Sequence, residues 1–312
     1  MKIFEDLSRV TKDKKTIITL GTFDGIHCGH KKILETVIQR ASEINGRSFL
    51  ITFNPHPRHV LSGKNLPGLL TTHREKIALL NLSGIENVLT INFTKEFSQL
   101  TPEEFVKNIL VDGIGLEEII IGTDHHFGKG RGGDIQTLQE MGSVFDFKVN
   151  SIQSFKLEDD AISSTKIRNL LTEGNIAKAN NYLGRKYSFS GTVVEGDKRG
   201  RKLGFPTANI KMESSEKLLP AIGIYVVELV LEGITHYGLL SVGKRPTFYT
   251  SGEIIPEVYI YDFDKEIYGE FVTVNLVERL RGEEKFLSAD DLIKQMNLDK
   301  TAGLKVLNNL VN

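Results

Sequence analysis

The sequence predicts two domains of different fold class. An α/β domain with a mainly parallel, doubly wound sheet is expected over residues 1–183, and an antiparallel β barrel or sandwich over residues 184–312. Up to residue 183, short apolar strands alternate with helical segments. Beyond residue 187, runs rich in Val, Ile, Tyr and Phe follow one another with only turns between them. A chain of 312 residues is long enough for two separate cores.

Hydrophobic periodicity defines the elements of the first half. The run from Thr16 to Leu20 is apolar and β-branched and ends at a glycine, which is typical of a buried strand. After the glycine-rich stretch that follows, six apolar residues fall on one helical face: Ile33, Leu34, Val37, Ile38, Ala41 and Ile44. The same reasoning predicts strands at 16–20, 48–53, 87–91 and 118–122, and helices at 31–44, 72–82 and 102–111.

The second half is expected to consist of strands that follow one another directly. Strand-like runs lie at 187–194, 224–231, 236–242, 257–262 and 271–276. A helix over 176–183 joins the two halves, and the tail from Ala289 onward is predicted to be helical and to pack on the barrel or sandwich.

Composition excludes several classes of function. There are 39 Lys and Arg against 40 Asp and Glu, so no basic excess is available to hold nucleic acid. No run approaches the roughly 18 apolar residues of a membrane span, and the first residues do not resemble a signal peptide. The single cysteine, Cys28, has no internal partner for a disulfide, so a reducing, cytoplasmic location is expected.

The first candidate site is the loop from Gly21 to His30. It follows a predicted strand and opens a predicted helix, where backbone N–H groups form a ready site for anions. His27 and His30 could donate hydrogen bonds to phosphate oxygens, and Gly29 would let the backbone approach a ligand closely. Two histidines near a turn are more often plain surface residues, but the strand before and the helix after favour a site. Cys28 has no evident partner base and is interpreted as a filler.

The second candidate site lies about half the chain further on. Residues 195–202 form a basic, glycine-containing turn that could fold over phosphates, although the Walker A ending is missing. Thr207 and Asn209, two residues apart on an extended strand, place a hydroxyl and an amide oxygen on one side. Hard oxygen ligands together with substrate phosphates suit Mg²⁺. From this pattern alone, a solvated turn is an equally good interpretation.

Several motifs together resemble one family. The loop 21–30 resembles the HxGH signature of the nucleotidylyltransferases, and 162–168 resembles their second signature. Residues 206–209 resemble the PTAN motif of riboflavin kinases. Further matches lie at 52–57, 122–131, 243–247 and 256–262. From Thr16 to about Leu287, the chain resembles the bacterial bifunctional riboflavin kinase/FAD synthetases. The resemblance implies a Rossmann-like nucleotidylyltransferase α/β domain followed by an antiparallel β-barrel riboflavin kinase domain.

The resemblance implies that the first domain transfers the adenylyl group of ATP to FMN, giving FAD and pyrophosphate. His27 and His30 would hold the triphosphate and stabilise the transition state, and Ser164, Thr165 and Arg168 would hold the leaving pyrophosphate. The remaining implied ATP and phosphate contacts are Gly21, Phe23, Asp24, Gly29, Asn54 and Asp124.

The resemblance also implies that the second domain phosphorylates riboflavin to FMN with ATP. Glu257 would be the general base that takes the proton of the ribityl 5′-hydroxyl, and Thr207 and Asn209 would hold Mg²⁺. The implied ATP and flavin contacts are Gly196, Lys202, Gly204, Pro206 and Arg245. Without the motif, Glu257 would be interpreted as an ordinary exposed strand residue.

The sequence departs from the family pattern at two positions. His125 stands where the family usually has an aromatic residue after the aspartate, and Ser241 stands where an asparagine is usual. These departures leave the local contacts of both sites open.

Three other interpretations compete with the prediction that the chain catalyses both reactions on riboflavin, FMN and ATP. They are a chain with one decayed site, an enzyme like the class I aminoacyl-tRNA synthetases, and a non-catalytic flavin-binding regulator. The length argues against the second, and the lack of a basic helix-turn-helix segment argues against the third. The sequence leaves the oligomeric state open.

Overall fold

The structure is a computed structural model, and it describes residues 1–61, 68–153, 155–157, 160–196, 200, 203–244 and 254–311. The residues group into two compact units. The first contains Met1–Pro67 and Thr71–Ser164, and the second contains Gly68–Leu70 and Thr165–Asn312. Among the described residues, no helix is long and apolar enough to cross a membrane.

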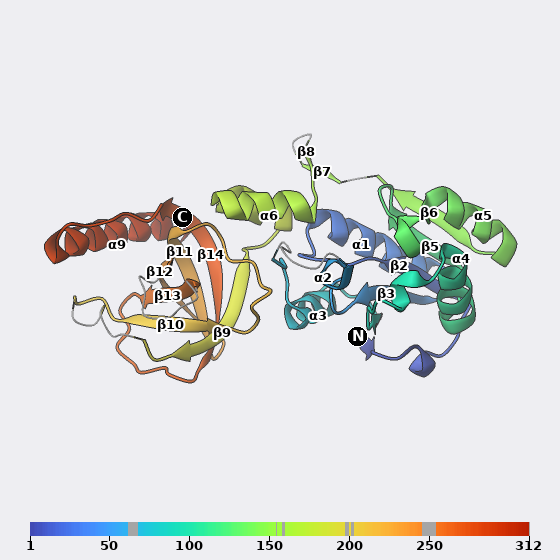
Figure 1. The fold of residues 1–312 in the computed structure, drawn as a ribbon, viewed down its shortest axis with the longest axis horizontal. Helices are drawn as coiled ribbons and strands as arrows, with labels where there is room; N and C mark the ends of the chain where they lie inside the picture. The colour runs from blue at the N-terminus through green and yellow to red at the C-terminus, as the bar shows by residue number, and fades with distance from the viewer. Residues whose placement is uncertain are drawn as a thin grey trace. The chain divides into compact units, whose positions relative to one another are not determined.

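The first unit is built on a parallel sheet of six strands in the order β1-β4-β3-β2-β5-β6 (Figure 1). β2 lies between β3 and β5 near the middle of the sheet, and all pairings are parallel. The strands are β1 (Lys2–Phe4), β2 (Thr16–Leu20), β3 (Arg47–Phe53), β4 (Asn87–Ile91), β5 (Glu118–Gly122) and β6 (Lys148–Ile152). The doubly wound α/β fold is confirmed.

Side chains of this sheet alternate between two cores because successive residues of a strand point to opposite faces. Ile17, Leu50 and Ile120 pack with α1 (Cys28–Glu43) and α3 (His73–Leu82). The next residues along, among them Ile18 and Ile51, pack on the other face with the π-helix η3 (Val106–Ile114) and α5 (Ile135–Phe145). The sheet is therefore covered on both faces.

Most predicted elements of the first half are confirmed within one to three residues, and one differs in kind. The helix expected over 102–111 is a short α-helix, α4 (Pro102–Phe105), that continues as η3. β1, α2 (Pro57–Leu61), α5 and β6 were not predicted. β6 has no buried residue, so it lacks the apolar run that marks a strand in sequence.

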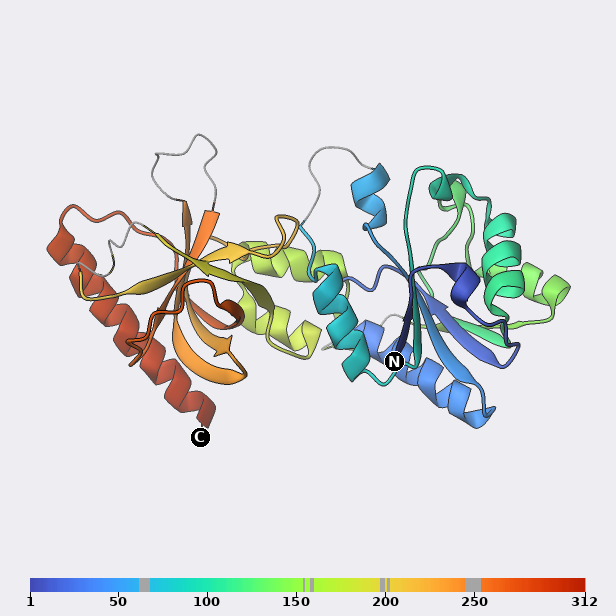
Figure 2. The same cartoon turned by 90° about the horizontal axis from the view of Figure 1, so that it is seen from below.

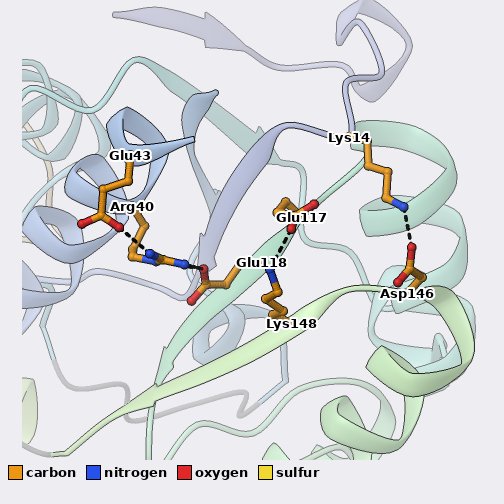
Figure 3. Close-up of polar contacts among 7 residues, drawn as sticks. All are labelled: Lys14, Arg40, Glu43, Glu117, Glu118, Asp146 and Lys148. Atoms are coloured by element: carbon orange, nitrogen blue, oxygen red, sulfur yellow. Dashed lines mark hydrogen bonds and ion pairs between the residues drawn. The ribbon is translucent and has the colours of Figure 1, made fainter. Parts of the chain in front are cut away.

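Ion pairs cover the edge of the first unit where β5 and β6 begin (Figure 3). Glu118, the first residue of β5, is only 5% exposed and accepts from Arg40 of α1 at 3.0 Å. Nearby, Lys148 pairs with Glu117 and Lys14 with Asp146. Since all strands run in parallel, their carboxyl ends lie at the opposite edge of the sheet.

The second unit is a closed antiparallel barrel in the order β10-β13-β12-β11-β14-β9, preceded by two helices, α6 (Ser164–Glu173) and α7 (Ile176–Leu183). The sequence predicted either an antiparallel barrel or a sandwich for this part of the chain, and the barrel is confirmed. Its strands are β9 (Ser188–Val194), β10 (Thr207–Met212), β11 (Gly223–Leu231), β12 (Ile234–Lys244), β13 (Ile254–Ile260) and β14 (Phe271–Arg281).

The C-terminal helix, α9 (Ala289–Val311), packs along the outside of this barrel (Figure 2). Leu307 of the helix joins Val226 and Leu239 in an apolar cluster. Arg281 at the end of β14 donates to both carboxylate oxygens of Asp299, at 2.9 and 2.7 Å. The predicted helical tail is therefore present and docked.

Three residues from the first half of the chain belong to the second unit. Leu69 pairs through its backbone with the loop at 216–218, and Lys217 donates its Nζ to the carbonyl of Leu70 at 2.7 Å. α6 and α7 also group with the barrel from Thr165 onward. The structure divides the chain at 164/165, and the domain boundary expected at 183/184 stays a prediction.

Candidate active sites

The loop from Gly21 to His30 lies at the carboxyl edge of the first sheet, directly after β2. Asn54 follows β3 and Asp124 follows β5, and these two strands flank β2. Predicted site residues thus follow three adjacent strands and lie at the same carboxyl edge of the sheet. That edge is where ligands bind in open α/β sheets.

His27 and His30 form a stacked pair at the start of α1. His27 is the N-cap of the helix, and its Nδ1 accepts the backbone N–H of His30 at 3.3 Å. The two imidazole rings lie 3.7 Å apart at 16°. Because Nδ1 of His27 accepts, its neutral ring carries the proton on Nε2, which is then a donor. The pair sits at the positive end of the helix dipole, a favourable place for phosphate.

The glycine-rich loop holds a strained conformation beneath these rings. Phe23 and Ile26 have positive φ angles of 46° and 38°, which side chains other than glycine rarely adopt. Both are buried, and the ring of Phe23 lies 4.7 Å from that of His30. A Cβ at Gly29 would press on the His27 ring at 3.2 Å. Packing therefore enforces the strain and fixes the histidine rings.

Hydrogen bonds from other segments brace the loop. Asp24 is 3% exposed, and its Oδ1 accepts the backbone N–H of Thr71 at 2.9 Å and the hydroxyl of Thr71 at 3.2 Å. The Thr71 hydroxyl also accepts the N–H of Gly25 at 3.0 Å. Ser164 donates its hydroxyl to the carbonyl of Asp24 at 2.9 Å. Asp24 and Ser164 thus have structural contacts beside their predicted roles in binding ATP.

Lys76 is a buried residue of this region that sequence reasoning missed. Its Nζ donates to the carbonyls of Thr22 and Phe53 and to the hydroxyl of Thr52. Burial lowers the pKa of Lys76 to about 8, against the opposing effect of nearby Asp24. The sequence does carry a signal: Lys76 and Leu80, four residues apart, are both buried on α3, so a lysine interrupts an apolar helix face.

Asp124 and His125 lie after β5, beside a cluster of aromatic rings. Asp124 is exposed, whereas burial lowers the pKa of His125 to about 4. The His125 ring stacks at 17° on Phe127, which contacts Phe105 in turn. At neutral pH, His125 is therefore an uncharged ring in the place where an aromatic residue was expected.

The predicted pyrophosphate ligands divide between the two units. Ser164 belongs to the first unit, while Thr165 and Arg168 belong to the second. Arg168 is 7% exposed, and its Nε donates to the carbonyl of Gly68 at 2.9 Å. Contact of Thr165 and Arg168 with pyrophosphate stays a prediction.

In the second unit, Glu257 lies at the meeting point of three strands. It stands directly across from Asn209 on β10 and from Ser241 on β12. The Thr207 hydroxyl donates to its Oε2 at 3.2 Å. Facing residues of paired strands lie on the same side of a sheet, so the carboxylate, hydroxyl and amide converge.

Glycines shape the approach to this cluster. A Cβ at Gly196 would overlap the side-chain amide of Asn209, so these two residues pack tightly. Gly204 has φ +82° in the turn before β10, and Pro206 is exposed at its end. Lys202 and Arg245, the two predicted basic contacts, lie outside the residues that the structure describes.

The part of the chain that the structure describes offers no metal site made of His, Cys, Asp and Glu side chains alone. Among the described residues, no group of three or more His, Cys, Asp and Glu side chains is placed to hold a metal ion. A metal at the cluster around Glu257 would instead bind to hydroxyl and amide oxygens together with substrate phosphates.

Comparison with known families assigns a different reaction to each half of the chain. A model described as FAD synthetase matches residues 9–166, and one described as riboflavin kinase matches residues 183–307. The first contains the histidine pair, and the second contains Glu257, Thr207 and Asn209.

Curated relatives match nearly the whole chain. Proteins described as bifunctional riboflavin kinase/FMN adenylyltransferase are 37% identical in Listeria monocytogenes, over 92% of this chain and 91% of theirs, and 35% identical in Bacillus subtilis, over 95% and 94%. A crystal structure of a Streptococcus pneumoniae protein described as a macrolide-efflux protein superposes with a TM-score of 0.87 at 30% identity, covering 96% of this chain and 97% of its own.

Proposed function

Because the chain belongs to the family of bifunctional riboflavin kinases/FMN adenylyltransferases, we propose that His27 and His30 serve its adenylyl transfer and that Glu257 serves its phosphoryl transfer. Both activities, with ATP as co-substrate and FMN and FAD as products, follow from the two family matches. Nothing found supports a decayed site or a non-catalytic regulator.

The stacked histidine pair at the start of α1 carries the adenylyl-transfer proposal. An oxygen of the FMN phosphate attacks the α-phosphorus of ATP, the new P–O bond forms, and the bond to pyrophosphate breaks. Charge grows on the transferred and leaving oxygens. Donors held rigidly by the helix start and the strained loop stabilise this charge without reorganising. Asn54 and Asp124 lie at the same edge and would orient the nucleotide.

The convergence of Thr207, Asn209 and Glu257 carries the phosphoryl-transfer proposal. Glu257 accepts the proton of the ribityl 5′-hydroxyl while the hydroxyl oxygen attacks the γ-phosphorus of ATP, and ADP leaves. The hydrogen bond from Thr207 holds the carboxylate in one orientation. Gly196 packs against Asn209 and so fixes the Asn209 amide beside the Glu257 carboxylate.

The same residues fit Mg²⁺. The Thr207 hydroxyl donates its hydrogen bond to Glu257, so the lone pairs of the hydroxyl oxygen are available to a metal ion. Asn209 supplies an amide oxygen from a buried position. Both are hard donors, as Mg²⁺ prefers. When bound, the ion would neutralise charge on the ATP phosphates. We propose a cytoplasmic location because the chain has a single cysteine.

One experiment tests both assignments. The protein is incubated with ATP, Mg²⁺ and either riboflavin or FMN, and products are separated by chromatography. Glu257→Ala should stop FMN formation and leave FAD formation from added FMN unchanged. His27→Ala and His30→Ala should let FMN accumulate and lower FAD formation by roughly 10²-fold or more. Riboflavin phosphorylation by Glu257→Ala near the parent rate would refute the assigned base, and unchanged FAD output from both histidine variants would refute the first site.

A further inference from the structure

A buried ammonium group lies behind the adenylyl-transfer site and joins two of its segments. We propose that Lys76 is a positioning residue for adenylyl transfer, whose ammonium fixes the glycine-rich loop against the end of β3. The inference rests on the proposed function of His27 and His30. None of the motifs that mark the site includes Lys76.

All three donors of the Lys76 ammonium are used. Nζ lies 3.2 Å from the Thr22 carbonyl, 3.0 Å from the Thr52 hydroxyl and 3.2 Å from the Phe53 carbonyl. Thr52 also donates its hydroxyl to the Thr22 carbonyl at 3.2 Å, which closes the network. Lys76 is 7% exposed and Thr52 is fully buried, so water does not compete for these contacts.

The two tethered segments carry predicted site residues. Thr22 opens the loop that leads to His27, and Phe53 directly precedes Asn54. A few residues before Lys76, Thr71 holds the middle of the same loop through Asp24 and Gly25. The stretch from Thr71 to Lys76 therefore holds the loop at two places. A shift of about 1 Å in reacting groups can cost roughly 10²-fold in rate, so this bracing bears directly on catalysis.

The charge state of Lys76 gives the proposal a measurable signature. Burial lowers its pKa to about 8, while Asp24 opposes the shift. The neutral amine has only two N–H donors for three acceptors, so the tether loosens as pH rises through this value. The free energy of unfolding changes in the opposite sense and increases as pH rises. Below about pH 8, the folded state bears the cost of burying the charge, and this cost fades as pH rises toward the ordinary lysine pKa of 10.5.

The charged or titratable groups that interact with Lys76 are Asp24 from the loop and His73 from the first turn of α3, where Glu75 directly precedes Lys76. The β3 residues to which Lys76 donates, Thr52 and Phe53, are uncharged. Replacing Lys76 by arginine keeps all of these groups and keeps the charge at every accessible pH. The activity ratio of Lys76→Arg to wild type therefore isolates the titration of residue 76.

The test compares full-length variants in FAD formation from FMN and ATP. Lys76→Met should lower kcat by roughly 10²-fold, and Thr52→Val, which removes one acceptor, by about 3- to 10-fold. Lys148→Met is the control, since Lys148 is 68% exposed at the opposite edge of the sheet, and it should stay within about twofold of wild type. Riboflavin phosphorylation in the same samples should not change. The Lys76→Arg to wild-type ratio should rise between about pH 7 and about pH 9.

Thr52→Val keeps the test decisive if Lys76→Met does not fold, because threonine and valine have nearly the same shape. A wild-type kcat for Thr52→Val, or a flat Lys76→Arg to wild-type ratio across this pH range, overturns the proposal. If the histidine variants lose FAD formation while Thr52→Val does not, only the positioning role fails. If the histidine variants stay active, the proposed site itself fails.

Discussion

At the scale of single residues, the contact between Gly196 and Asn209 makes a sharp prediction. A Cβ at residue 196 would overlap the Asn209 side chain and push it from its place across from Glu257. Gly196→Ala should therefore lower riboflavin phosphorylation by about tenfold or more while FAD formation from added FMN is retained. Steady-state assays of both reactions measure this.

The control for this substitution is Gly282→Ala. A Cβ at Gly282 meets only the Arg279 side chain, at 3.8 Å, which is ordinary contact. Its kinase rate should stay close to wild type. If Gly196→Ala were equally active, Asn209 would not need a fixed position for phosphoryl transfer.

The residues that sequence could and could not predict differ in how far apart they lie along the chain. His27 and His30 form one short motif, so their closeness can be read directly. Lys76 and Thr71 contact the same loop from about fifty residues away, and only the fold brings them there. The converging positions of Asn209, Ser241 and Glu257 likewise depend on the register of three strands, which the residue pattern does not specify.

At the scale of elements, one buried ion pair holds α9 on the barrel. Asp299 is 5% exposed and accepts from Arg281 and also from Gln295, at 2.9 Å. Asp299→Ala would leave the Arg281 guanidinium poorly paired, so the free energy of unfolding of this unit should fall by about 2–4 kcal/mol. The change is measured by denaturant unfolding, with loss of kinase activity as the readout.

The same helix offers a matched control. Asp291 pairs with Lys294 at 3.9 Å and accepts the Ser288 hydroxyl at 2.7 Å, and more than half of its side chain is exposed. Asp291→Ala should lower the free energy of unfolding by less than about 1 kcal/mol because water screens exposed pairs and can replace these contacts. Equal effects of the two substitutions would show that α9 is held by its apolar contacts at Leu307 rather than by Asp299.

Elements with a strong apolar pattern were predicted well, and those without it were missed. β4 and β5 match their expected ranges because each contains a run of buried apolar residues. β6 is a half-exposed edge strand, and β1 has three residues, none of them buried, so neither carries a clear pattern. The π-helical turns of η3 share the apolar face of an ordinary helix, so periodicity predicts a helix without its type.

At the scale of the whole molecule, the division into units determines which fragments can work alone. The change in composition near Tyr187 and the predicted joining helix over 176–183 suggest a kinase fragment that begins near Lys178. However, α6 and α7 group with the barrel: the Ala221 amide donates to the Leu171 carbonyl at 2.9 Å, and the Asn180 side chain donates to the Leu276 carbonyl at 2.9 Å. Starting at Lys178 removes all of α6 and the buried Ile176.

We therefore expect a fragment 165–312 to make FMN from riboflavin and ATP, and to melt above a fragment 178–312 by about 5 °C or more. Loss of one buried apolar side chain such as that of Ile176 removes about 1.5–3 kcal/mol of burial free energy, which corresponds to a shift of several degrees in a unit of this size. Thermal unfolding and a kinase assay on both fragments provide the measurement. Equal melting temperatures would show that α6 adds nothing to the barrel. A folded but inactive 165–312 would show that phosphoryl transfer needs the first unit, and the assignment of the kinase reaction to the barrel alone would then be withdrawn.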